Sequence, residues 1–229
     1  MYAVNLQGKT IKLMNMKILK TIMATAIGVL MTTSCNAASG KAKAAESEPA
    51  QETQVNNNVA EEKALIVFFS HAGENYAVGN IEVGNTKVVA DFIKDYTHAD
   101  QFEVVAEKSY DMPYKDLIKV AKEEQNKGEK PAFKGSVDNM SDYDVVFVGT
   151  PIWWGTFPQV MFTFFDKYDL NGKTIIPFTT HEGSGLGSVV NDLKKIYPNA
   201  KYEKALSIKG TDARTSKERV EKWLKELGF

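Results

Sequence analysis

The sequence predicts an α/β domain over residues 61–229, in which helices cover both faces of a parallel sheet. Two observations predict it. Apolar runs of strand length that do not alternate, such as ALIVFFS at 64–70 and DVVFVGT at 144–150, are typical of strands buried on both faces. Segments with an apolar residue every three or four positions follow these runs, as expected for helices that pack against a sheet.

Five strands and five helices alternate along this domain. The strands are predicted at residues 64–70, 101–107, 144–150, 173–180 and 200–208. The helices are predicted to begin at Thr86, Tyr114, Pro158, Leu186 and a capping-box pattern of Thr215 with Glu218. A doubly wound sheet binds ligands at the carboxyl ends of its strands. The loops after the first, third and fourth strands should therefore form the site.

The first 60 residues are predicted to serve export. Residues 1–35 read as a signal peptide with a basic start, an apolar run too short to span a bilayer and a small-residue end, and Met16 is an alternative start. The ending at Cys35 resembles a bacterial lipoprotein signal, which predicts a lipid anchor on the cell envelope; a plain secretory signal or a buried helix are the alternatives. Residues 36–60 are polar and predict a disordered tether.

Composition excludes several chemistries from the domain. Cys35 is the one cysteine and lies outside it, so disulfides, thiolate metal sites and thiol catalysis are excluded. A formal net charge of -1 with interspersed charges gives no basic face for nucleic acid. The three histidines, His71, His98 and His181, are too scattered to predict a zinc site.

The loop after the first strand has the features of an anion site. It begins at Ser70-His71-Ala72-Gly73 and resumes at Gly84-Asn85-Thr86, where a helix starts. Helix N-termini bind phosphate through free N–H groups and the helix dipole. A glycine turn with Thr86 as a simple helix cap is the alternative.

The loop after the third strand holds two adjacent tryptophans, Trp153 and Trp154, behind Thr150-Pro151-Ile152. Two indoles are costly to expose, and a flat aromatic ligand would cover them. The alternative is that they pack into the core, which we expect for one of the pair.

The loop after the fourth strand, His181-Glu182-Gly183-Ser184-Gly185-Leu186-Gly187, has glycine at alternate positions. Such glycines allow the backbone to approach a ligand closely, although for this loop taken alone a flexible connection is the favoured interpretation. The three loops together would suit a phosphate joined to a flat heterocycle.

Three segments resemble the flavodoxin-like family. They are residues 68–87, which contain FFSHAGEN and VGNTK, residues 146–158 (VFVGTPIWWGTFP) and residues 178–187 (FTTHEGSGLG). The resemblance implies a three-layer sandwich with sheet order 2-1-3-4-5 and one non-covalent FMN. It implies phosphate contacts from Ser70, His71, Ala72, Gly73, Asn85 and Thr86. It implies flavin contacts from Thr150, Pro151, Ile152, Trp153, Trp154, His181, Glu182, Gly183, Ser184 and Gly185. The ten residues Glu74–Val83 interrupt the phosphate loop, unlike in most flavodoxins.

Three functions are compatible with such a domain. The first is an electron carrier on the envelope that serves a redox partner protein or a small-molecule acceptor. The second is an FMN-dependent NAD(P)H:quinone or nitro reductase, and the third is a non-redox FMN-binding envelope protein. Tryptophan faces and Glu182 would disfavour negative charge on a reduced flavin and lower its potential.

Overall fold

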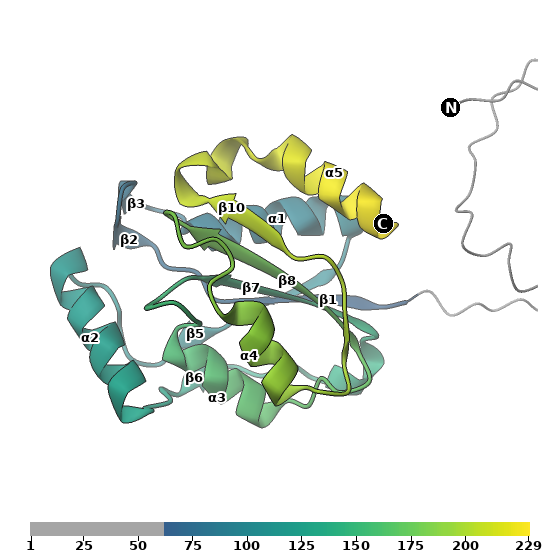
Figure 1. Ribbon diagram of the computed structural model, residues 1–229, viewed down its shortest axis with the longest axis horizontal. Helices are drawn as coiled ribbons and strands as arrows, with labels where there is room; N and C mark the ends of the chain where they lie inside the picture. Colours follow the sequence, from purple (N-terminus) through teal and green to yellow (C-terminus); the bar gives the residue numbers. More distant parts are fainter. Residues whose placement is uncertain (1–61) are drawn as a thin grey trace, which may run out of the picture. The chain divides into compact units, whose positions relative to one another are not determined.

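A parallel sheet forms the centre of the described part of the chain, residues 62–229 of a computed structural model (Figure 1). Its order is β10-β8-β7-β1-β4, and every pairing is parallel. The strands are β1 (Ala64–Phe68), β4 (Asp100–Glu103), β7 (Val145–Pro151), β8 (Thr174–His181) and β10 (Leu206–Lys209), and the short β9 (Lys201–Tyr202) pairs with β8. In chain order this is 2-1-3-4-5, which confirms the predicted topology.

Both faces of the sheet are covered, as the unalternating apolar runs predicted. In β1, Leu65 and Val67 belong to one core cluster, while Ile66 and Phe68 belong to the other. Helices α1 (Asn85–Thr97) and α5 (Lys217–Leu227) cover the second cluster. Helices α3 (Gln159–Lys167) and α4 (Val189–Ile196) cover the first, on the opposite side of the sheet in Figure 1.

Helix α2 (Tyr114–Lys127) stands apart from these layers, on the same side of Figure 1 as the antiparallel hairpin of β2 (Gly73–Asn75) and β3 (Gly79–Ile81). It buries only Leu117, Ala121 and Glu124. Polar contacts hold it to neighbouring loops. The Tyr114 N–H donates to Glu74 Oε2 at 3.0 Å, and the Trp154 Nε1–H donates to the Ile118 carbonyl at 2.9 Å.

Two predicted strands are divided in the structure. The predicted strand 101–107 becomes β4 and β5 (Val105–Ala106), and β5 pairs antiparallel with β6 (Phe133–Lys134) instead of joining the main sheet. The predicted strand 200–208 becomes β9 and β10. Both segments mix polar and apolar residues, QFEVVAE at 101–107 and AKYEKALSI at 200–208, and such a pattern does not show where a strand changes its pairing partner.

The predicted capping box at Thr215 and Glu218 is wrong. Thr215 ends a 3₁₀ turn, Gly210–Thr215, and its hydroxyl donates to the Asp212 carbonyl at 3.1 Å. Ser216 occupies the N-cap position of α5 instead, but its hydroxyl donates to the Ala213 carbonyl at 2.7 Å and caps no helix amide. The turn satisfies these hydroxyls locally and moves the helix start by one residue.

The predicted signal peptide and tether, with Met16 and Cys35, lie outside the described residues. Within residues 62–229, no helix combines the length and apolar character needed to cross a bilayer.

Candidate functional site

A cavity of about 390 Å³ lies where the loops after β1, β7 and β8 meet. One part of its lining is polar and includes Asn85, Thr86, Thr180 and Glu182. Another part is apolar and combines Ile152, Trp153 and Trp154 with residues of α2. A ligand with a charged end and a flat apolar end matches this division.

The polar end is built around the start of α1. The hydroxyls of Thr86 and Thr180 are 2.7 Å apart and buried, which joins the start of α1 to β8. The Lys87 N–H donates to Ser70 Oγ at 3.0 Å, so Ser70 already satisfies one amide of the first helical turn. The first amides of a helix have no acceptor within the helix and are available to an anion.

Arg214 adds a positive charge to this end, and the sequence reasoning missed it. Its guanidinium donates to Asn85 Oδ1 and to the Val83 carbonyl, each at 2.9 Å. Arg214 lies in the 3₁₀ turn before α5, more than a hundred residues from the loop that it contacts. No local sequence pattern links the two segments, so the pairing is visible only in the fold.

The two tryptophans take different positions. Trp153 is partly buried and meets the rings of Phe69 and Tyr110 edge to face, with centroids 5.3 and 5.1 Å away. Trp154 is 50% exposed, has a φ of 50°, and carries the Lys122 ammonium 4.7 Å above its ring. Its indole N–H donates to α2. Both residues line the cavity, and Trp154 also holds the helix that forms one wall.

The loop after β8 closes the rim through its backbone. The Gly183 N–H donates to His181 Nδ1 at 2.9 Å, and Glu182 Oε1 accepts from the Thr211 N–H at 2.9 Å. Gly183 and Gly185 have φ values of 128° and 60°, which only glycine adopts readily. These turns direct His181, Glu182 and Ser184 to the cavity.

The structure brings ten of the sixteen predicted site residues to the cavity wall: His71, Asn85, Thr86, Pro151, Ile152, Trp153, Trp154, His181, Glu182 and Ser184. The remaining six lie elsewhere. Ser70, Ala72 and Gly73 line a neighbouring cavity of about 500 Å³, which His71 also borders. Thr150 is fully buried, with its hydroxyl on the Pro151 carbonyl at 2.8 Å. Gly183 and Gly185 shape the turn beside the cavity.

Several lining residues come from segments that the sequence analysis did not assign to the site. They are Asn75 and Tyr76 of the insertion, Tyr114, Leu117, Ile118 and Ala121 of α2, and Thr180 and Gly210. The rings of Tyr76 and Tyr114 stack with centroids 6.0 Å apart, which joins the hairpin to α2. The narrow apolar face of α2, in which Leu117 and Ala121 are the buried apolar residues, is the one signal of this position in the sequence, because a helix that covers a cavity buries less than one packed on a sheet.

His71 connects the two cavities and should make stability depend on pH. It is 8% exposed, and its Nε2 has no hydrogen-bond partner within the described residues. Burial lowers the pKa of the imidazole, while a main-chain hydrogen bond at Glu74 and the charge of Asp111 act in the opposite direction. As the pH falls below about 6.5, the unfolded chain takes up a proton before the folded one, so acid lowers the free energy of unfolding.

Replacing His71 with Gln should therefore flatten the pH dependence of unfolding between pH 7 and pH 5, by at most about 1.4 kcal/mol per pH unit. Urea unfolding across this range measures it. The less buried His181, whose pKa burial also lowers, contributes in the same direction, so His181→Gln is the comparison variant. An unchanged slope in His71→Gln would show that this imidazole does not titrate differently on folding.

Comparison with known proteins agrees with this architecture. A flavodoxin family model matches residues 63–227. A putative flavoprotein from Bacteroides eggerthii is 28% identical, with a TM-score of 0.59 over 74% of this chain and 99% of that chain. One from Bacteroides uniformis is 26% identical, with a TM-score of 0.59 over 72% and 98%.

A flavoprotein from Lactobacillus acidophilus, crystallised in complex with FMN, is 20% identical, with a TM-score of 0.52 over 72% of this chain and 99% of that chain. No curated protein matches the chain. The family match extends from the residue before β1 to the last residue of α5, so it covers the whole sheet and all the loops that line the cavity. The chain belongs to the flavodoxin family.

Proposed function

We propose that this chain binds one FMN non-covalently and acts as an electron carrier on the cell envelope, where a lipid on Cys35 would anchor it. The observation that supports the FMN proposal is the divided cavity, which has the polar start of α1 at one end and indoles with an apolar helix face at the other. Its volume of about 390 Å³ lies within the usual range for small-molecule sites. A flavoprotein of the same fold has been crystallised with FMN.

The residues at the polar end fit a phosphate. Gly84 precedes α1, and a Cβ there would lie 2.6 Å from the His71 carbonyl oxygen and closer still to Ser70 Oγ. The loop and the helix start therefore approach each other as closely as glycine allows. Asn85, Thr86 and the N-terminal amides of α1 would hold the phosphate, and Arg214 would contribute positive charge through Asn85.

The residues at the other end fit a flat ring. Trp153, Trp154 and Ile152 would contact the isoalloxazine from the β7 loop, and Leu117, Ile118 and Ala121 from α2. His181, Glu182 and Ser184 would meet its polar edge. Bound FMN would supply the electron-transfer chemistry. These side chains would exclude water from the ring and determine how strongly negative charge on the reduced ring is disfavoured.

Enclosure by α2 favours a carrier over a reductase. Hydride transfer from a nicotinamide needs a donor stacked on the ring, whereas electron transfer needs only the approach of a partner to its edge. Because α2 and the β7 loop both line the apolar end, a ring held there would contact both segments and leave less of its face open to a stacked nicotinamide. Steady-state oxidation of NADH or NADPH with a quinone as acceptor tests the reductase; a carrier should show none above the rate of free FMN.

The FMN proposal predicts one-to-one binding with strong quenching of flavin fluorescence. The measurement is a titration of the purified protein, freed of flavin, with FMN. Trp153→Leu and Trp154→Leu should each weaken binding by about tenfold, since an aromatic pair contributes roughly 0.5–1.5 kcal/mol beyond its area. Trp223→Phe is the matched control, because Trp223 lies on the buried face of α5, outside the cavity lining, and its N–H donates to the Lys204 carbonyl at 2.8 Å. Absence of quenching in the unmodified protein would rule the proposal out.

A further inference from the structure

Tyr110 lies between the cavity and a buried carboxylate. Its ring meets Trp153 edge to face, with centroids 5.1 Å apart and planes at 89°. Its hydroxyl donates to the Glu124 carboxylate, with oxygens at 3.0 and 3.2 Å. Tyr110 is 6% exposed and Glu124 is 1% exposed. A cavity-lining indole, a buried phenol and a buried carboxylate are therefore in consecutive contact.

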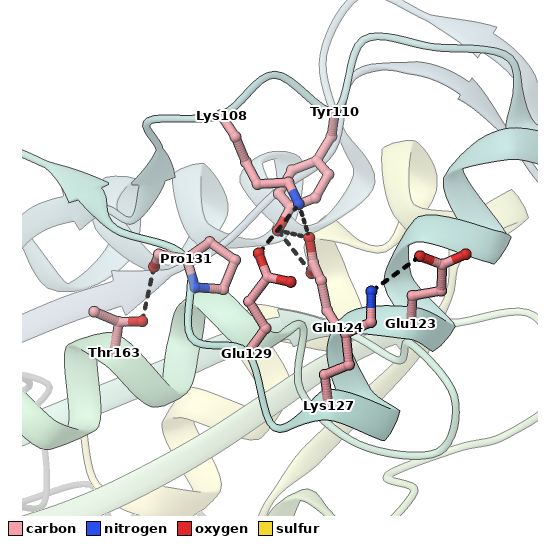
Figure 2. A network of polar contacts seen from close by, with 8 residues as sticks. All are labelled: Lys108, Tyr110, Glu123, Glu124, Lys127, Glu129, Pro131 and Thr163. Atoms are coloured by element: carbon pink, nitrogen blue, oxygen red, sulfur yellow. Dashed lines mark hydrogen bonds and ion pairs between the residues drawn. The ribbon is translucent and has the colours of Figure 1, made fainter.

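Lys108 is placed so that it keeps a counterion whether or not Glu124 is charged. Figure 2 shows the Lys108 ammonium between Glu124 and Glu129. Lys108 pairs with Glu124 and also lies 3.9 Å from Glu129 Oε1. If Glu124 became neutral, the ammonium would keep Glu129 as its counterion. The charge of this cluster can thus change by one without leaving a buried ion unpaired.

Tyr197 shows that a buried tyrosine in this fold does not need a carboxylate. The Tyr197 hydroxyl is satisfied by the main-chain carbonyls of Phe165 and Tyr168 at 3.1 and 2.8 Å. Burying a carboxylate is costly, and apolar packing often replaces a buried ion pair without loss of stability. Burial and the charge of Glu124 also raise the pKa of the Tyr110 phenol well above its usual value, so this residue keeps its O–H proton.

We propose that Trp153, Tyr110 and Glu124 form a relay that removes oxidising equivalents from the flavin cavity. Its role rests on the proposed function, since the oxidant is a one-electron oxidant in that cavity such as light-excited flavin. Trp153 gives one electron to the oxidant and becomes a cation radical. Tyr110 then gives one electron to Trp153, its O–H bond breaks, and the proton passes to Glu124. The products are a neutral tyrosyl radical, a protonated Glu124 and a restored Trp153.

The relay can be tested in the full chain without flavin. Azide radicals generated by pulse radiolysis oxidise tryptophan, and transient absorption follows the tryptophan and tyrosyl radicals. We expect the tryptophan radical to decay by a first-order, concentration-independent step while the tyrosyl radical rises. Tyr110→Phe should abolish this step, and Tyr197→Phe should leave it unchanged. Each variant is first checked for cooperative unfolding and an unaltered circular dichroism spectrum.

The role of Glu124 has its own measurements. Glu124→Gln should slow the transfer by roughly 10²-fold, the low end of what a positioned base contributes. Transfer in the unmodified protein should also slow in D₂O, which needs no variant. A tyrosyl yield that persists in Tyr110→Phe would overturn the relay. Transfer rates that are the same in water and D₂O, and also the same in Glu124→Gln as in the unmodified protein, would overturn it as well. Because no flavin is present, this outcome is independent of whether FMN binds.

Discussion

Replacing Lys108 with methionine should lower the free energy of unfolding by about 3 kcal/mol, the lower end of the cost of breaking a buried pair. Glu124 has 2% of its side chain exposed and would lose its cation, while water cannot reach it to compensate. Tyr110 would still donate to the carboxylate, which keeps the loss at the lower end. Urea unfolding at neutral pH measures the effect.

Lys127→Met is the matched control. Lys127 pairs with Glu123 one turn away on the same helix at 3.5 Å, but both side chains are about two-thirds exposed, at 67% and 68%. Figure 2 draws both pairs. Exposed pairs within a helix contribute about 0.3–0.5 kcal/mol, so this variant should hardly change stability. Equal losses in the two variants would mean that Glu124 is not isolated from solvent.

The sequence could not predict that Glu124 is buried while Glu123 is exposed, although it could predict the sheet. The sheet was predictable because burial on both faces leaves a direct record: β1 places Leu65 and Val67 on one side and Ile66 and Phe68 on the other. Strand order followed from the resemblance to the flavodoxin-like family. These features depend on local patterns or on rules common to all parallel sheets.

The position of α2 was not predictable in the same way. Its anchors are single polar contacts between distant segments, such as Glu74 with the Tyr114 N–H and Trp154 with the Ile118 carbonyl. Glu124 reads in the sequence as one of many helical surface acids, yet the fold buries it. Arg214 likewise contacts Asn85 at the start of α1, although 129 residues separate the two in the sequence. Contacts of this kind leave no periodicity, so only the assembled fold reveals them.

Replacing Gly84 with alanine should reduce the preference for FMN over riboflavin by about 10- to 100-fold, the equivalent of one or two charge-assisted hydrogen bonds. Gly84 has φ −63° and ψ 147°, a conformation that alanine adopts without strain. The obstacle is space, because the new Cβ would lie 2.6 Å from the His71 carbonyl oxygen. The loop must move away from the start of α1, which separates the groups proposed to surround the phosphate.

Titration of each variant with FMN and with riboflavin measures this preference. The ratio of the two affinities separates damage to the phosphate site from general damage, since overpacking also costs about 1–3 kcal/mol of stability and weakens both ligands together. Val83→Ala is the control: the side chain is 41% exposed, and Arg214 contacts only its carbonyl. If Gly84→Ala weakened FMN and riboflavin by the same factor, the helix start would not be the phosphate site. The polar end of the cavity would then need another ligand.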